Sequence, residues 1–195
     1  MIQWPAGERI RLRPPTVDDQ PAIDAWRLSR HRSRWNDRGG PPRTIAERLA
    51  AGPLIGPEGG MLLIVRLADE VPIGDIAWRP VYYGRTGDVR SRAWRIGREM
   101  LAGARGQGLG TEAMRLLVDW LFATTEVNRV DGYTDVENIA SQRSVEKAGW
   151  RREGVLRGTV YRDGRHRDVI MYGLTRADWE ARHISPDGGA GNAHH

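Results

Sequence analysis

The 195-residue sequence predicts a mixed α/β fold in a single domain. Its length is about that of one domain and is sufficient to bury a sizeable core. Stretches of alternating apolar and polar residues, typical of strands, occur between stretches with apolar residues at helical spacing. Near the C-terminus, Asp163-Gly164 separates two alternating stretches and is a strong hairpin signal. Together these observations predict that helices and strands contribute to one sheet.

The N-terminal half is expected to hold several strands and two helices. A first strand at 9–14 ends at Pro14-Pro15, because proline cannot donate to a sheet ladder. Thr16 then provides the N-cap of a helix. The remaining elements are a short helix at 42–52, two strands within 61–83 joined at 68–70, and a strand at 91–101.

The C-terminal half continues the pattern. Apolar residues from Leu109 to Leu121 fall on one helical stripe. A strand is expected at 129–136, followed by a helix that Asn138 caps and Gly149 stops. The elements after it are two strands at about 151–161 and 165–174. Residues 1–183 are expected to form the domain and the glycine-rich stretch 184–195 a disordered tail that includes a remnant of a tag.

The composition excludes several classes of protein. The chain has no cysteine, so a disulfide framework, a thiolate metal site and a cysteine nucleophile are excluded, and no metal site is expected. The longest apolar run, 61–65, is too short to cross a bilayer. The first 15 residues lack the apolar segment of a signal peptide. We therefore expect a cytoplasmic protein that does not associate with membranes.

The formal net charge of +5 raises the question of a nucleic-acid partner. Basic residues cluster at 27–35 and 162–168, and they would steer an acidic partner. However, all the basic residues except Lys147 are arginines, which indicates a coding bias rather than a surface adapted to phosphate. A solvated basic face is the favoured interpretation.

The stretch GARGQGLGTEA at 103–113 carries alternate glycines between a predicted strand and a predicted helix. Free N–H groups and the helix dipole attract anions to a helix start. Glycine lets a phosphate approach the backbone, and Arg105 adds positive charge at the rim. A tight turn without a ligand is the alternative, but three alternate glycines favour a phosphate site.

Two well-known phosphate motifs do not explain this stretch. A P-loop requires Gly-Lys-Ser/Thr, whereas Gly110-Thr111 has no lysine. Residues 108–113 match the dinucleotide pattern G-x-G-x-x-A, with Asp131 about 20 residues further on. The preceding strand, however, is charged and amphipathic instead of continuously apolar, as a buried parallel strand would be. We interpret this match as coincidental.

Arg105 to Gly110 instead fit the R/Q-x-x-G-x-G/A signature of the GNAT N-acetyltransferases. The chain resembles this family from about residue 8 to residue 175, and most of all the branch of the ribosomal-protein amino-terminal acetyltransferases RimJ and RimL. Four blocks carry the resemblance in the same order: 10–19, 96–113, 137–158 and 164–174. The resemblance implies a mostly antiparallel, twisted sheet of about seven strands, splayed at a cofactor slot and flanked by about four helices.

The resemblance also implies acetyl-CoA as the cofactor. Backbone amides of the glycine stretch would hold the pyrophosphate of coenzyme A, and the end of the preceding strand would pair with the pantetheine arm. The next helix start would contact the cofactor near its thioester. The residues assigned to the cofactor in this way are Met100, Leu101, Arg105, Gly106, Gln107, Gly108, Leu109, Gly110, Thr111, Asn138 and Ser141.

The chemistry requires a neutral amine, so a base must take a proton. By the resemblance Glu99 is the candidate base and Ser141 the candidate proton donor, although Glu99 facing solvent and Ser141 as a mere first-turn residue are alternatives. Many members place a tyrosine acid where this chain has Val145. Water, Tyr161 or Tyr172 would then replace it.

Trp35, Glu99 and Tyr172 are assigned to the acceptor pocket. The leading hypothesis is an acetyl-CoA-dependent N-acetyltransferase that acts on a primary amine, either a protein N-terminus or a small molecule. A second is an enzyme of this fold that acts on aminoacyl-tRNA, suggested by the arginines at 27–38 and 151–167. A third is a non-catalytic acyl-CoA-binding module. Whether the chain is a monomer or a homodimer stays open.

Overall fold

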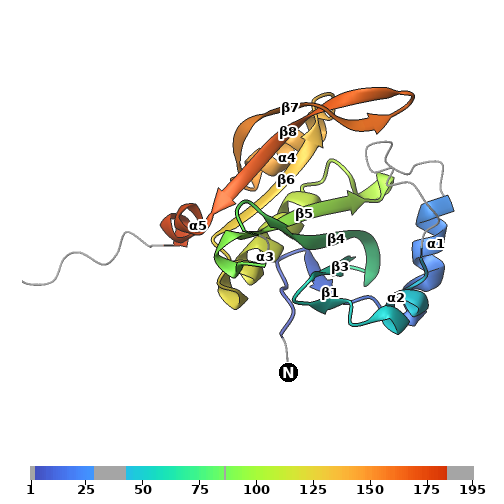
Figure 1. The fold of residues 1–195 in the computed structure, drawn as a ribbon. Coiled ribbons are helices and arrows are strands. Elements are labelled where there is room, and N and C mark those ends of the chain that lie inside the picture. The colour runs from blue at the N-terminus through green and yellow to red at the C-terminus, as the bar shows by residue number, and fades with distance from the viewer. Residues whose placement is uncertain (1–2, 29–42, 86, 184–195) are drawn as a thin grey trace, which may run out of the picture.

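The computed structural model describes residues 3–28, 43–85 and 87–183. The strands are β1 (Ile10–Arg13), β2 (Ile55–Gly56), β3 (Gly59–Arg66), β4 (Val71–Tyr82), β5 (Arg92–Met100), β6 (Arg129–Asp135), β7 (Arg151–Arg162) and β8 (Arg165–Thr175). The helices are α1 (Gln20–Leu28), α2 (Ile45–Ala51), α3 (Leu109–Thr124), α4 (Ile139–Lys147) and α5 (Arg176–His183). All the strands join one sheet, with β2 beside β3 and the others in the order β1-β3-β4-β5-β6-β8-β7 (Figure 1).

The sheet is antiparallel except where β5 meets β6. These two strands are parallel and pair at only two positions, Trp94 with Val130 and Arg95 with Asp131. Beyond this point they diverge, which Figure 1 shows as a widening gap between their ribbons. The sheet is therefore splayed at its centre, as the family resemblance implies.

The sheet has an apolar core on each face. On β3, Leu62 and Ile64 pack in the cluster that contains α3, whereas Leu63 and Val65 pack with residues of α1 and α2. All four are fully buried. This double burial explains why β3 is continuously apolar instead of alternating.

The fold class predicted from the sequence is confirmed, with differences at three elements. The predicted helix after Thr16 begins as a 3-10 turn, Val17–Asp19, and α1 starts only at Gln20. The Asp19 carboxylate accepts a hydrogen bond from the Thr16 N–H (2.8 Å) and a bidentate pair from Arg13 (both 2.7 Å). Its hydrogen bonds to Arg13 hold the pKa of Asp19 below its ordinary range. Two elements, β2 and α5, are additional to those predicted.

No helix among the described residues is long and apolar enough to cross a membrane. The stretch 184–195, predicted to be a tail, lies outside the described residues.

Candidate active site

The three alternate glycines are required for two different reasons. Gly106 and Gly108 have φ angles of 76° and 80°, a left-handed conformation that residues with a Cβ rarely adopt. Gly110 is helical, but a Cβ atom there would lie 2.9 Å from the guanidinium carbon of Arg98. The stretch is therefore a turn followed by a close contact, and α3 begins at its end.

The backbone N–H groups of this turn are not used within the described part of the protein. No N–H group from Gly106 to Thr111 donates a hydrogen bond to another described residue. The carbonyls do have donors: Arg9 Nη1 reaches the carbonyl of Gln107 at 2.9 Å, and Arg98 reaches that of Gly110. A row of unused donors at a helix start is the arrangement that binds phosphate.

A hollow of about 490 Å³ lies beside this turn. Gly108 and Thr111 line it together with Arg9, Arg115 and Lys147. Glu8 and Glu112 line it as well, and Glu112 pairs with Arg9 (2.9 Å), so the lining carries both signs of charge. Its position at the positive end of α3 suits an anionic group.

The space between the diverging strands begins next to the turn. The N–H of Leu101 donates to Ile73 on β4 (2.9 Å), and its carbonyl accepts from Ala104 (3.0 Å). Because alternate residues of an antiparallel strand direct their backbone groups to opposite sides, those of Arg98 and Met100 face β6. The Met100 carbonyl accepts from Arg105 Nε at 2.9 Å. Arg98 and Met100 thus line the slot, while the backbone groups of Leu101 are used within the protein.

Helix α4 follows β6 on the other side of the slot. The Asn138 side chain accepts from the Ser141 N–H at 3.2 Å, which confirms Asn138 as the N-cap. The Ser141 hydroxyl is half-buried and forms no hydrogen bond with a described residue. It is therefore available to a ligand in the slot.

Glu99 points to the face of the sheet opposite α3. It pairs with Asp75 of β4 in the ladder, so the two half-buried carboxylates lie side by side on one face. Leu63, the partner of Asp75 on β3, belongs to the core beneath α1 and α2 on that same face. The sequence analysis missed Asp75, because only the strand register brings it to Glu99.

Tyr172 is buried rather than exposed to the slot. Only 1% of its surface is accessible, and its hydroxyl donates to Glu146 Oε1 at 2.9 Å. Its assignment to the acceptor pocket remains a prediction.

Tyr161, the other candidate acid, is exposed and packs edge-on against His166 with ring centroids 5.2 Å apart. Trp35 lies outside the described residues.

The environment of Tyr172 predicts a measurable pH dependence. Burial and the hydrogen bond to Glu146 raise the pKa of Tyr172 from 10.0 to about 12. The folded state thus disfavours the phenolate. The contribution of the protonated Tyr172 to the free energy of unfolding is therefore complete below pH 10 and is lost as the pH rises through about 12. Ultraviolet titration of tyrosinate should show one late step that is missing in Tyr172→Phe. An unchanged titration curve in that variant would show that the late step does not belong to Tyr172.

Asp131, which matches the ribose-binding acid of the dinucleotide pattern, is fully buried. It accepts hydrogen bonds from Arg95 Nε (2.7 Å) and from the Tyr83 hydroxyl. Its carboxylate is therefore unavailable to a ribose, in agreement with the coincidental interpretation of that pattern.

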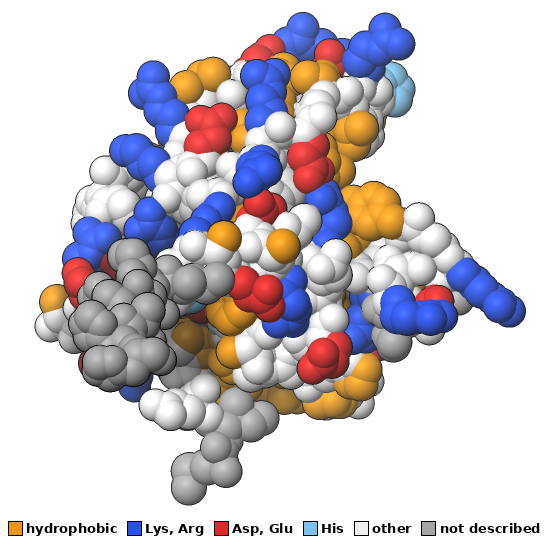
Figure 2. All heavy atoms as spheres, turned by 90° about the vertical axis from the view of Figure 1, so that its left-hand side faces the viewer, with side chains coloured by type: hydrophobic (Ala, Val, Ile, Leu, Met, Phe, Trp, Pro, Cys, Tyr) orange, Lys and Arg blue, Asp and Glu red, His pale blue; other side chains and the backbone are white. Residues whose placement is uncertain are grey.

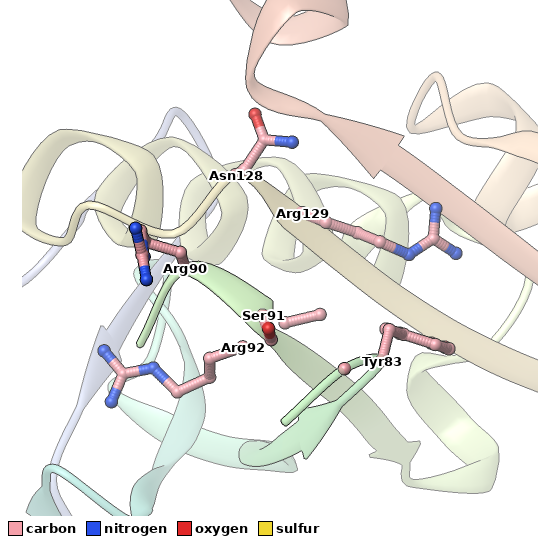
Figure 3. Close-up of a pocket in the computed structure, with 8 residues that line it drawn as sticks. Tyr83, Arg90, Ser91, Arg92, Asn128 and Arg129 are labelled. Carbon is pink, nitrogen blue, oxygen red and sulfur yellow. The ribbon is translucent and has the colours of Figure 1, made fainter. Parts of the chain in front are cut away.

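A second hollow, of about 220 Å³, lies at the other end of β5. Three arginines line it, but Figure 3 shows their guanidinium groups pointing in different directions. Arg90 pairs with Asp88 (3.1 Å) and Arg129 with Glu153 (2.5 Å). The face in Figure 2 likewise shows basic side chains interspersed with acidic and uncharged ones. Neither observation indicates a continuous basic surface.

The chain is similar to several acetyltransferases. A family model described as "Acetyltransferase (GNAT) domain" matches residues 9–151. The putative ribosomal N-acetyltransferase YdaF of Bacillus subtilis is 33% identical over 93 residues, which are 48% of this chain and 51% of YdaF. The chain spans about half the length of the curated relatives that it matches.

Two solved structures share the fold. RimL, a ribosomal L7/L12 alpha-N-protein acetyltransferase in complex with coenzyme A, has a TM-score of 0.73 at 17% identity, covering 90% of this chain and 99% of RimL. Spermidine N-acetyltransferase from Vibrio cholerae, in complex with CoA and spermine, has a TM-score of 0.72 at 17% identity, covering 88% and 98%. With the family model matching most of its length, the chain belongs to the GNAT acetyltransferase family.

Proposed function

We propose that the protein is an acetyl-CoA-dependent N-acetyltransferase that acts on a primary amine carrying positive charge. The observation that carries this proposal is the row of unused N–H groups from Gly106 to Thr111, placed where β5 and β6 separate. Membership of the GNAT family supports the same cofactor and reaction type.

The residues present fit coenzyme A. The amides of 106–111 would hold its pyrophosphate, and Arg105 would lie at the rim of that site. The backbone groups of Arg98 and Met100 would pair with the pantetheine arm in the slot. Asn138 and Ser141 would lie near the thioester, with Asn138 also fixing the start of α4.

Acetyl-CoA would supply an activated acetyl group, which would pass to the amine nitrogen with the coenzyme A thiolate as leaving group. A Glu99 carboxylate oxygen would take the proton that the ammonium group must lose to become nucleophilic. Ser141 Oγ would donate a proton to the leaving thiolate. Asp75, opposite Glu99 in the ladder, adds a second carboxylate on that face.

The acceptor class is based on two observations. Asp75 and Glu99 place two carboxylates side by side on one face of the sheet. The acceptors named for related proteins, a ribosomal protein for RimL and spermidine for the Vibrio cholerae enzyme, are amines. A polycationic amine is therefore the acceptor that we propose.

The test combines binding with turnover. Acetyl-CoA at 100 times its Kd should raise the free energy of unfolding by about 2.7 kcal/mol. Release of free thiol is then measured with spermidine, an aminoglycoside, an uncharged primary amine and a peptide with a free N-terminus. We expect the highest kcat/KM with the polycationic amines. Absence of stabilisation by acetyl-CoA would refute the cofactor, and preference for the uncharged amine would refute the acceptor class.

A matched pair of variants serves as the control for binding. Gly108→Ala should weaken acetyl-CoA binding, because its φ of 80° is strained for alanine. Gly103→Ala changes the same stretch where a Cβ would meet nothing within 4 Å and should bind normally. Equal binding by both variants would show that the turn conformation does not matter.

The hypothesis of an aminoacyl-tRNA substrate rested on two groups of arginines. Most of 27–38 lies outside the described residues. In the hairpin of β7 and β8, Arg167 and Arg165 lie near Glu137 (3.0 and 3.6 Å), and Arg162 pairs with Asp135. These carboxylates reduce the positive potential that tRNA would require.

A further inference from the structure

We propose that Arg98 is a positioning residue for the cofactor: it fixes the turn 106–111 from below and adds positive charge beneath the bound pyrophosphate. This inference rests on the proposed function. It gives the side chain of Arg98 a role in holding the cofactor, which the assignments above did not include.

Arg98 stands where the pattern of β5 predicts an apolar residue. Its neighbours on the same face of the strand, Trp94, Ile96 and Met100, are buried in the core with α3. Arg98 lies on the same face and is partly buried, and burial lowers the pKa of Arg98 to about 10, so the group is still charged at neutral pH. A charged side chain at an apolar position requires a compensating interaction.

The contacts of Arg98 lead directly to the turn. Its guanidinium donates to the Gly110 carbonyl and, at 3.2 Å, to the Ser144 hydroxyl on α4. Ser144 Oγ in turn lies 2.9 Å from Thr111 Oγ1. Arg98 thereby links the first turn of α3 to α4. The N–H of Thr111 belongs to the same peptide unit as the Gly110 carbonyl and points the opposite way, so the contact with Arg98 also fixes the direction of that N–H.

Arg98 and Gly110 are packed directly against each other. The guanidinium lies at the first turn of α3, where it donates to the Gly110 carbonyl. The same carbonyl contact excludes a Cβ at position 110, where it would be 2.9 Å from the guanidinium carbon. Gly110 and Arg98 thus depend on each other, and both serve the surface that would face the pyrophosphate.

The test compares two acetyl donors, acetyl-CoA and S-acetylpantetheine, which has the thioester and the pantetheine arm without phosphates. In Arg98→Met we expect KM for acetyl-CoA to rise about tenfold or more, the effect of one charge interaction. The kcat/KM for S-acetylpantetheine should fall by a clearly smaller factor, because this donor has no phosphate for the turn to hold. Arg98→Lys, which keeps the charge, should recover part of the acetyl-CoA affinity.

Arg176 offers a matched control at the other end of α3. Its guanidinium donates to the carbonyls of Phe122 (2.9 Å) and Val127 (3.2 Å). At this C-terminal end of α3 the helix dipole stabilises a cation. Arg176→Met should lower Tm without changing the ratio of the two donors.

The outcomes are distinguishable. Equal losses with both donors in Arg98→Met would overturn the proposal, because they would show a merely structural role. If Arg98→Met does not fold, Arg98→Lys and the Kd of ADP, which carries adenosine and the pyrophosphate without the pantetheine arm, decide in the same way. A wild-type protein that uses neither donor would instead refute the proposed function.

Discussion

Glu99→Gln is expected to lower kcat for acetyl transfer by about 100- to 10 000-fold, the range for loss of a general base. Glutamine keeps the size of the side chain and its place beside Asp75 but cannot take a proton. KM for acetyl-CoA should change little, because the cofactor contacts lie in the turn and the slot. Steady-state kinetics at saturating donor, with free thiol as the readout, measures both quantities.

The control is the same amide substitution on the neighbouring strand. Asp75→Asn removes the charge opposite Glu99 without removing the base. We expect a raised KM for the cationic acceptor with kcat largely kept. If Glu99→Gln retains the wild-type kcat, water rather than Glu99 removes the proton.

Asp131→Ala should destabilise the protein by about 3–5 kcal/mol, the typical cost of removing one partner of a buried ion pair. Asp131 is fully buried between Arg95 and Arg129, with N–O distances of 2.7 and 3.7 Å. It also accepts from Tyr83, whose pKa is raised by burial and by this hydrogen bond. Without the carboxylate, Arg95 loses the ion pair with Asp131, while Arg129 keeps its pair with Glu153 (2.5 Å). Urea unfolding measures the loss.

Asp88→Ala is the corresponding change in an exposed pair. Asp88 pairs with Arg90, whose side chain is 88% exposed, so we expect only a small loss of stability. The double variant Asp131→Ala/Arg95→Met should recover part of the stability, because it removes a charge left unpaired. A cost for Asp131→Ala as small as that of Asp88→Ala would contradict this account.

Local signals were sufficient to predict most of the fold. Asp163 and Gly164 have φ angles of 51° and 74°, as a two-residue turn with that dipeptide requires. The stripe from Leu109 to Leu121 is the buried face of α3. Helix α5 was not predicted, although Thr175 and Asp178 form a capping pair at 2.7 Å that the sequence Thr-x-x-Asp indicates.

The candidate site was only partly predictable, because its missing members depend on tertiary contacts. Asp75 reaches Glu99 through the register of β4 and β5, which no local pattern specifies. Arg98 and Gly110 share space although they belong to different elements. The glycine turn itself was recognisable because its constraints are local: two of its three glycines are needed for their own φ angles.

The narrow contact between β5 and β6 also affects how the chain folds. All pairings of β1 to β5 lie within residues 10–100, and all those of β6 to β8 within residues 129–175. Each half can thus form its part of the sheet before the two join, since loop closure favours contacts of shorter sequence separation. A ligand that contacts both sides of the slot would bind only after β5 has paired with β6. Acetyl-CoA is then expected to slow unfolding rather than to accelerate folding.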